Sequence, residues 1–183
     1  IGKMAINGTL IDEYDATSPA DPDSNPLGIT KGPDGNIWYT LAGTTDAIVK
    51  MDTSGNILDT ITVTPGSEPT NIISAGGSLW FTERSANKIG KVTTAGVYTE
   101  SPTEVPTASS EPFALALGPD GNVWFTERAG NKIGRMSTTD MSFLPEFTIP
   151  TAASNPEGIA AAPDGQSMWF TENATSKIGQ ISL

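Results

Sequence analysis

The stretch "WFTERSANKIGKV" at residues 80–92 recurs as "WFTERAGNKIGRM" at residues 124–136 and as "WFTENATSKIGQI" at residues 169–181. A weaker copy, "WYTLAGTTDAIVKM", occupies residues 38–51. The tryptophans of the four copies are spaced 42, 44 and 45 residues apart. A period of this length that is built from short strands indicates the blades of a β-propeller, with four strands in each blade.

One period of the repeat divides into four runs of strand-forming residues, which are separated by turn residues. The segment Pro119-Asp120-Gly121-Asn122 predicts a tight turn between the first and second runs, because Asp and Gly tolerate the dihedrals of such turns. Pro145 interrupts the outermost run and predicts a bulge or a sheet edge there. The expected strands of this period are residues 112–118, 123–127, 132–136 and 142–150.

The first two strands of each period are apolar on both faces, which is typical of a sheet that is covered on both sides. Each blade of a propeller packs against two neighbours, so both of its faces need apolar side chains. One tryptophan recurs at the same position in every blade. We therefore expect contacts between blades, rather than stacking on a ligand, for Trp38, Trp80, Trp124 and Trp169.

These features predict an all-β protein, a β-propeller of about four four-stranded blade repeats of ~44 residues each. We expect a single domain over residues 1–183, with repeats that begin near residues 1, 48, 89 and 133 and a partial repeat at 178–183. The sequence at the N-terminus matches the third and fourth strands of a blade. The sequence at the C-terminus matches a first, a second and a third strand. One blade is therefore expected to be split between the termini, with one strand in surplus.

The surplus strand leaves three interpretations open. The chain is a piece of a longer propeller, or it closes as a four-bladed ring with a displaced strand, or its free edge pairs with another chain. Self-association through edge strands is thus an expected partner interaction, because an unpaired edge is a template for pairing. The chain begins with Ile1 rather than Met, so we expect a processed or excised product.

Composition removes several classes of function. The 183 residues include no cysteine and no histidine, which excludes disulfides, thiolate metal sites and an imidazole base. The net charge of −11 leaves no basic stripe for nucleic acid, so no nucleic-acid partner is expected. No apolar run approaches the ~18 residues of a membrane span. The cysteine-free, acidic composition rich in Thr, Asn and Pro favours an extracellular or periplasmic location.

The segment "GPDGNVWFTERAGNKIGRM" at residues 118–136 resembles the streptogramin lyase (virginiamycin B lyase) family of β-propellers, in which "DG-x-x-W-F-T-E…NKIGR" recurs from blade to blade. The resemblance covers essentially all 183 residues and is strongest at 76–101, 118–136 and 163–181. It implies a seven-bladed ring and an elimination that needs a catalytic histidine, assisted by glutamate and Mg²⁺. No position here can supply that histidine, so we carry over the fold and not the catalytic residues.

The loops after the second strands and the crossovers into the next inner strand are expected to share one face of the propeller. The repeats place Glu83-Arg84, Glu127-Arg128 and Glu172-Asn173 there, and the crossovers add Glu68, Glu111 and Glu157. We favour strand-end ion pairs or turn caps for the Glu-Arg pairs. The alternative is a site for a ligand or for a hard cation, Mg²⁺ or Ca²⁺. Leu41 replaces the glutamate in the first repeat, so a ring of carboxylates would be incomplete.

A second candidate metal site lies in "DPDSNP" at residues 21–26, where Asp21, Asp23 and Asn25 resemble the start of a calcium loop. Pro26 occupies the place of the required glycine, and no glutamate closes the loop, so we favour a solvated crossover. The acceptor pattern for N-glycosylation occurs at Asn7 and Asn173.

The sequence as a whole favours a non-catalytic extracellular propeller that acts as a binding or structural scaffold module and self-associates through its surplus strand. A small molecule or a glycan is the expected type of ligand. The alternative is a divergent Mg²⁺-dependent carbon–oxygen lyase that eliminates across a lactone or ester linkage, or a related metal-dependent reaction on carbohydrates or lactones. The missing histidine weighs against an enzyme without deciding the question.

Overall fold

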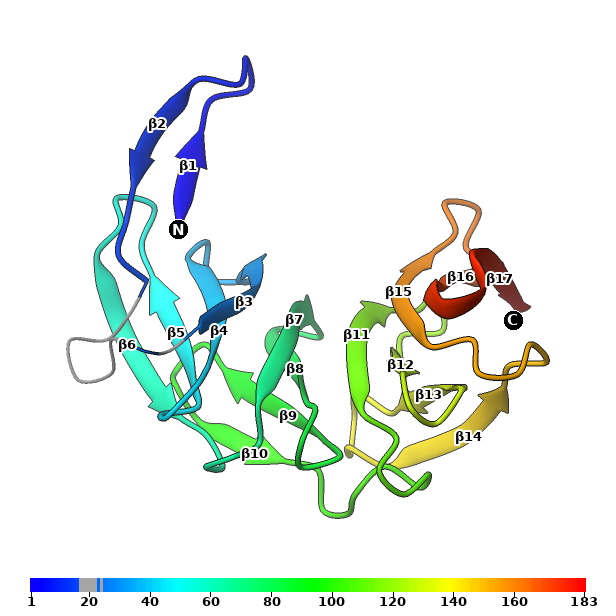
Figure 1. Ribbon diagram of the computed structural model, residues 1–183. Helices are drawn as coiled ribbons and strands as arrows, with labels where there is room; N and C mark the ends of the chain where they lie inside the picture. Colours follow the sequence, from blue (N-terminus) through cyan, green and yellow to red (C-terminus); the bar gives the residue numbers. More distant parts are fainter. Residues whose placement is uncertain (17–22, 24) are drawn as a thin grey trace.

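The computed structural model describes residues 1–16, 23 and 25–183, and it shows a row of antiparallel sheets that follow one another along an open arc (Figure 1). Three of these sheets are complete four-stranded blades. The strands of the three blades are β3 (Asn25–Lys31), β4 (Ile37–Ala42), β5 (Ala47–Met51) and β6 (Ile57–Thr62); β7 (Pro69–Ala75), β8 (Ser78–Glu83), β9 (Lys88–Thr93) and β10 (Tyr98–Glu100); and β11 (Pro112–Leu117), β12 (Val123–Glu127), β13 (Lys132–Met136) and β14 (Phe143–Thr148).

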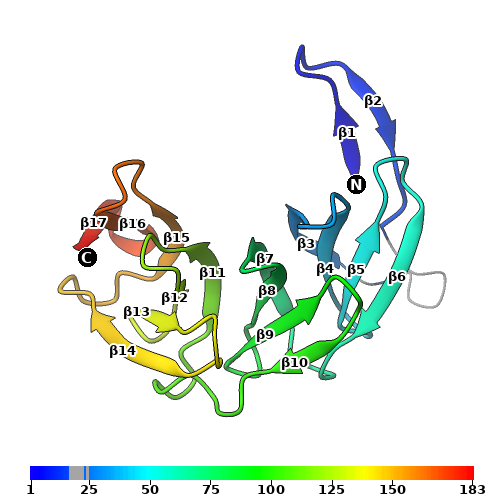
Figure 2. The ribbon, with the colours of Figure 1, turned by 180° about the vertical axis from the view of Figure 1, so that it is seen from behind.

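Two partial sheets occupy the ends of the arc. The hairpin of β1 (Gly2–Met4) and β2 (Leu10–Glu13) forms one. The other consists of β15 (Pro156–Ala161), β16 (Ser167–Glu172) and β17 (Lys177–Ser182), with the 3-10 turn η1 (Asn173–Thr175) between its last two strands. Views from both sides place these sheets at opposite ends of the arc (Figure 2).

The all-β propeller architecture predicted from the sequence is confirmed, with one difference at the termini. The terminal strands have the predicted types, but they form two separate sheets rather than one split blade. The physical reason is packing at the N-terminus, because Ile1 and Tyr14 pack against the core cluster of the first complete blade. The hairpin therefore lies beside that blade and does not pair with the last sheet.

Strand boundaries in the third complete blade match those expected from the sequence to within two residues. The register between β13 and β14 shifts where Ile133 faces Phe147 and Arg135 faces Leu144. Pro145 lies in this irregular stretch, so the bulge predicted from the proline is confirmed.

Each tryptophan of the complete blades is buried against the next sheet along the chain. Trp38 lies in one core cluster with Ile72, Leu79 and Val92, all of which belong to the following blade. The next two blades repeat this arrangement, in which three aliphatic or methionine side chains form what we call a tryptophan seat. Trp80 is clustered with Leu115, Val123 and Met136, and Trp124 is clustered with Ile159, Met168 and Ile181.

The predicted packing of tryptophans between blades is therefore confirmed for Trp38, Trp80 and Trp124. Trp169 differs, because 43% of its surface is exposed. It lies in β16 and lines an open recess together with Ile178 of β17.

The threonine two residues after each tryptophan joins neighbouring blades through its hydroxyl group. Thr126 Oγ1 accepts a hydrogen bond from the Ala114 backbone N–H in its own blade at 3.0 Å. The same hydroxyl donates to the Glu157 carbonyl of the next sheet, also at 3.0 Å. The other two complete blades repeat this bridge, with Thr40 between Gly28 and Thr70 and Thr82 between Asn71 and Phe113.

The glycine of the repeated "IG" makes room for the phenylalanine that follows the tryptophan. Gly134 faces Phe125 across the pair of strands β12 and β13. A Cβ atom at Gly134 would overlap the Phe125 ring, and the same holds for Gly90 against Phe81. The repeated glycine is therefore required by close packing and needs no functional explanation.

We expect Thr126→Val to lower the free energy of unfolding by about 1–3 kcal/mol, because two partly buried backbone groups lose their shared partner. The matched control is Thr171→Val in the last sheet, where the exposed hydroxyl accepts one bond, from the Gly158 N–H. Urea denaturation of both variants measures the difference. Equal losses would show that the bridge between blades adds nothing.

Candidate functional site

One face of the arc carries both the crossovers and the loops that follow the second strands, as the sequence predicted. The Arg84 N–H donates to the Glu68 carbonyl at 3.3 Å, and the Arg128 N–H donates to the Glu111 carbonyl at 3.1 Å. The Asn173 N–H donates to the Asn155 carbonyl at 3.3 Å in the last sheet. We call this surface the crossover face. It comprises loops 84–87, 128–131 and 173–176 and crossovers 63–68, 101–111 and 149–155.

The asparagine of the repeated "NK" fastens loops 84–87 and 128–131 to the crossovers beside them. Asn87 Oδ1 accepts bonds from the Ser110 N–H at 3.0 Å and from the Ser110 hydroxyl at 2.9 Å. Its Nδ2 donates to the carbonyls of Val105 and Thr107. Asn87 has a φ of 55°, a backbone conformation that asparagine tolerates better than most residues. Asn131 bonds Ser154 in the same way, so this repeated letter is structural.

The Glu-Arg pairs predicted from the sequence do not bond to each other. Glu83 and Glu127 are fully buried, whereas the arginines next to them extend over the crossover face. Arg84 forms an ion pair with Glu68 of the crossover. Arg128 Nε donates to Asn155 Oδ1 at 3.1 Å and lies 3.4 Å from Glu157 Oε1. The ion pairs thus join loops to crossovers, because alternation along a strand points adjacent side chains in opposite directions.

The third predicted pair also separates. Glu172 is 5% exposed and accepts a hydrogen bond from the Thr175 hydroxyl at 3.2 Å. Asn173 is exposed in the turn η1. The three repeated glutamates therefore lie on three different sheets and do not converge on a common site.

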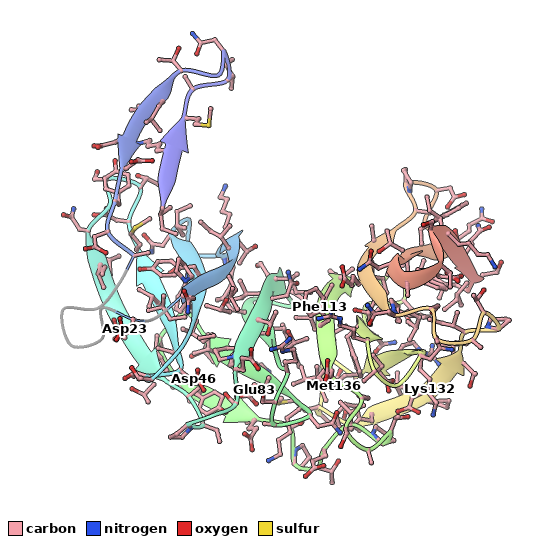
Figure 3. All side chains as sticks on the ribbon, viewed as in Figure 1. Asp23, Asp46, Glu83, Phe113, Lys132 and Met136 are labelled. Carbon is pink, nitrogen blue, oxygen red and sulfur yellow. The ribbon has the colours of Figure 1, made fainter. Side chains whose placement is uncertain are left out.

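A recess of about 440 Å³ opens on the crossover face between the first three blades. The Arg84–Glu68 ion pair borders it. The Arg128 guanidinium lies 5.4 Å from the centre of the Phe113 ring at one side. Figure 3 shows Phe113 near the inner rim of the arc, with Glu83 set back from it. The lining residues are Leu27, Glu68, Thr70, Asn71, Arg84 and Phe113.

Sequence reasoning missed the position that contributes most to this recess. Each inner strand begins at or next to the crossover proline, and the residue after that proline is Leu27, Thr70, Phe113 or Glu157 in successive sheets. The repeated sequence contains a signal that could have identified this position. This position changes its chemistry from blade to blade, while the letters that build the blades stay constant.

The described residues do not fit a bound Mg²⁺ or Ca²⁺. No group of three or more Asp or Glu side chains in residues 1–16, 23 and 25–183 could hold a metal ion. Glu68 and Glu157 are held by arginines on the crossover face. In the proposed calcium loop, Asp23 lies in a turn and Asn25 begins β3, while Asp21 lies outside the described residues.

Burial leaves the carboxyl group of Glu83 poorly solvated. The Tyr98 hydroxyl donates to its Oε1 at 2.6 Å, while Oε2 has no hydrogen-bond partner. Burial raises the pKa of Glu83 to about 7; the Tyr98 hydroxyl opposes the rise and the negative charge of Glu100 adds to it.

The equivalent Glu127 has even less support, because neither of its carboxyl oxygens has a hydrogen-bond partner. Phe143 packs against Phe125 at 6.1 Å, as Tyr98 packs against Phe81 at 6.0 Å, so the blade of Glu127 lacks the tyrosine hydroxyl. Burial and then the negative charge of Glu146 raise the pKa of Glu127 to about 7.

Lysine–glutamate pairs lie beside both buried carboxyl groups. Lys132 Nζ is 2.7 Å from Glu146 Oε2, and Lys88 pairs with Glu100 in the same position of the preceding blade. Burial tends to raise the pKa of Glu146. The hydrogen bonds from Lys132 and Thr107 outweigh this effect, so the pKa of Glu146 is lowered. The second and third complete blades thus each have one carboxyl that favours its charged form beside one that resists it.

The sheets and their order define a β-propeller fold. The model of the virginiamycin B lyase family matches residues 11–183 of this chain. The chain therefore belongs to the virginiamycin B lyase family.

Individual relatives agree with this assignment. The chain is 35% identical over 87 residues to virginiamycin B lyase from Nocardia farcinica, which is 47% of this chain and 30% of the relative. A catalytically inactive His→Ala variant of virginiamycin B lyase from Staphylococcus aureus, solved with quinupristin, superposes with a TM-score of 0.87 and 36% identity. This superposition covers 99% of the present chain and 59% of the relative.

Selenomethionine-substituted virginiamycin B lyase from S. aureus gives a TM-score of 0.83 at 33% identity, over 100% of this chain and 62% of the relative. The chain thus spans about three fifths of the length of the lyases it resembles. Within the described residues, no helix is long and apolar enough to cross a membrane.

The buried glutamates predict an unusual dependence of stability on pH. Their pKa rises from 4.5 to about 7 on folding, so the folded state binds more protons than the unfolded state between these values. Stability should therefore fall as the pH rises from about 5 to 8, by on the order of 3 kcal/mol per glutamate. Carboxyls with a lowered pKa, such as Glu68 and Glu146, act oppositely and lose their stabilisation below about pH 4.5.

Urea denaturation from pH 4 to 9 measures this profile. Glu127→Gln should remove about half of the decline above pH 5, and Phe143→Tyr should reduce it by supplying the hydroxyl that Glu83 has. Both variants should keep the loss of stability at low pH. An unchanged slope above pH 5 in Glu127→Gln would show that this carboxyl does not titrate in the folded protein.

Proposed function

We propose that this chain is a ligand-binding segment of a lyase-type propeller, and that it holds a cyclic peptide lactone over the recess without performing the elimination itself. The observation that supports this proposal is that the constant and the variable positions of the repeat have different roles. The constant letters are used in packing and in hydrogen bonds between blades. The variable position after the crossover proline lines the recess instead.

The chemistry of the recess suits an amphipathic ring. Leu27 and Phe113 offer apolar surface, and the two arginines can donate hydrogen bonds to peptide and ester carbonyls. Binding sites for small molecules combine such apolar walls with a few oriented polar groups. The structure of the S. aureus relative with quinupristin supports the choice of ligand class.

Elimination requires a base that reaches a substrate proton, and Glu68, the carboxylate that lines the recess, forms an ion pair with Arg84. The chain has no histidine. Glu83 and Glu127 have pKa values of about 7 but no exposed surface. Glu68 and Glu157 face the ligand side but are held by Arg84 and Arg128. These arrangements support binding without turnover by this set of residues.

Calorimetric titration with quinupristin tests the binding proposal. We expect a saturable one-to-one interaction that Phe113→Ala weakens by about tenfold, because an aromatic wall of the recess is lost. The matched control is Val97→Ala, since Val97 is exposed in the turn between β9 and β10, away from the crossover face. Equal affinities for the wild type and Phe113→Ala would contradict the proposed site. A titration that gives no heat of binding for the wild type would contradict the ligand class.

A divergent carbon–oxygen lyase is the second candidate, and family membership and the near-neutral pKa values of Glu83 and Glu127 favour it. Incubation of the folded protein with quinupristin and Mg²⁺, followed by mass spectrometry of the ring-opened product, separates the two proposals. We expect no product. Turnover that Glu127→Gln or Glu83→Gln abolishes would establish the lyase instead.

An extracellular or periplasmic location is also proposed, on the composition alone.

A further inference from the structure

A second recess, of about 590 Å³, lies on the crossover face beside the first complete blade. Gly66 and Glu68 of crossover 63–68 and Asp46 of the first blade line it, so we call it the Asp46 recess. Asp46 is 3% exposed. Its carboxylate accepts hydrogen bonds from the backbone N–H of Gly43 at 3.2 Å and from that of Glu68 at 3.1 Å.

Asp46 has no cationic partner within the described residues, because the ion pairs that these residues form involve other carboxylates. Glu68, the second carboxylate of the lining, is already paired with Arg84 and accepts a bond from the Ser85 hydroxyl at 2.5 Å. Carboxylates are almost never so deeply buried in proteins unless they are paired. Asp46 therefore carries the uncompensated negative charge of this recess.

The second blade has an asparagine in the place of Asp46. The Asp46 carbonyl accepts a bond from the Val63 N–H of its crossover, as the Asn87 carbonyl does from the Val105 N–H. Asn87 is neutral, and its Nδ2 donates to the carbonyls of Val105 and Thr107. A carboxylate has no hydrogen to donate. The exchange of an amide for a carboxylate thus adds a charge and removes two donated hydrogen bonds.

The first blade also lacks the arginine that the next two blades carry on this face. The fourth residue after the tryptophan is Arg84 in the second blade and Arg128 in the third, but it is Ala42 in the first. Ala42 lines the Asp46 recess. The first blade therefore combines an additional negative charge with the loss of a positive one.

The crossover serine beside this recess has an unsatisfied hydroxyl group. Ser67 is fully buried and its Oγ has no hydrogen-bond partner. Its counterpart Ser110 donates its hydroxyl to Asn87 Oδ1 at 2.9 Å. Ser67 lies between Gly66 and Glu68, which both line the recess. A buried polar group without a partner requires an explanation, and an unidentified ligand is one.

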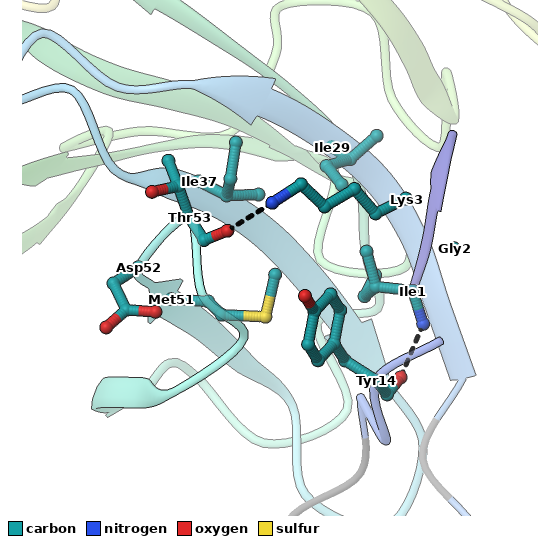
Figure 4. A pocket seen from close by; sticks show the side chains of 9 residues that line it. All are labelled: Ile1, Gly2, Lys3, Tyr14, Ile29, Ile37, Met51, Asp52 and Thr53. Carbon is teal, nitrogen blue, oxygen red and sulfur yellow. Dashed lines mark hydrogen bonds between the residues drawn. The ribbon is translucent and has the colours of Figure 1, made fainter. Parts of the chain in front are cut away.

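The apolar recess of about 180 Å³ beside the N-terminal hairpin lacks these features (Figure 4). Ile1 and Tyr14 line it and pack against the core cluster of the first blade. Its carboxylate, Asp52, accepts bonds from the backbone N–H and the side-chain amide of Asn56 in the same turn. These bonds are exposed, so the charge of Asp52 is solvated and needs no cation.

We propose that the Asp46 recess binds the ammonium group of an aliphatic primary amine, and that Asp46 pairs with its charge. Each carboxylate oxygen retains a lone pair beyond its backbone bond, so both can accept N–H donors of the ammonium group. Pro26, Leu27 and Ala42 line the recess as well and supply apolar surface for the carbon chain. The net charge of −11 attracts a cationic ligand.

This site does not depend on the proposed binding of a lactone. Leu27 and Glu68 line both recesses, but Asp46 does not line the recess of Phe113, and Phe113 does not line the Asp46 recess. Phe113→Ala should therefore bind an amine as the wild type does. The two proposals fail separately.

Titration of ¹⁵N-labelled protein with n-hexylamine at pH 7, followed by amide chemical shifts, tests the proposal. A primary amine is protonated at this pH. The amides of Gly43 and Glu68 report on the site, because both donate to the Asp46 carboxylate. We expect saturable shifts of these two amides with n-hexylamine and none with 1-hexanol, which has the same chain without the charge.

Asp46→Asn should weaken the binding by about tenfold or more, because the charged hydrogen bonds are lost. The variant restores the amide of the second blade, so the fold should survive. Asp164→Asn is the matched control, since it removes the same charge from an exposed turn between β15 and β16. Ala42→Arg should block the recess with the arginine of the other blades while Asp46 is kept, and it decides the question if Asp46→Asn does not fold.

Three results would overturn the proposal. The first is a wild type whose Gly43 and Glu68 amides show no saturable shift with n-hexylamine. The second is equal affinity for n-hexylamine and 1-hexanol. The third is a folded Asp46→Asn or Ala42→Arg variant that binds n-hexylamine as tightly as Asp164→Asn does.

Discussion

The contact on which the structure depends is the seating of one blade's tryptophan among three aliphatic or methionine side chains of the next blade. A single sheet cannot bury this side chain by itself, since both of its faces point outward until a neighbour arrives. The threonine hydroxyls bridge adjacent sheets, and Asn87 and Asn131 fasten their loops to the neighbouring crossovers. Stability therefore passes from one blade to the next along the row of sheets.

This dependence explains how the repeat separates structure from recognition. Tryptophan in its seat and threonine across the gap recur in all three complete blades. Glycine under phenylalanine and asparagine on the crossover recur in the second and third of these blades. The side chain after the crossover proline does not make the same contact in each blade. The residue type at this position can therefore vary. Its variation among Leu27, Thr70, Phe113 and Glu157 gives the crossover face a different character in each sector.

The buried glutamates fall between these two categories. They are constant in three repeats, yet burial disfavours their charged form, and Glu127 lacks the tyrosine that partly supports Glu83. A buried carboxyl with unsatisfied oxygens lowers stability unless it is protonated. Their near-neutral pKa values would suit acid–base chemistry on an open surface, but both side chains are fully buried and neither lines the recess.

The sequence by itself determined the blade, because a repeat of ~44 residues with alternating apolar runs and turn residues has few other solutions. It located the strands of the third blade to within two residues, the bulge at Pro145 and the shared crossover face. It also indicated that the tryptophans pack between blades.

The tertiary structure alone decided which side chains meet. Arg84 bonds to Glu68, sixteen residues away in sequence, rather than to its neighbour Glu83, because pleating sends adjacent side chains to opposite sides. The terminal hairpin lies apart from the last sheet because Ile1 and Tyr14 pack against the core cluster of the first complete blade. No local pattern of letters encodes which distant sheet a terminal segment packs against.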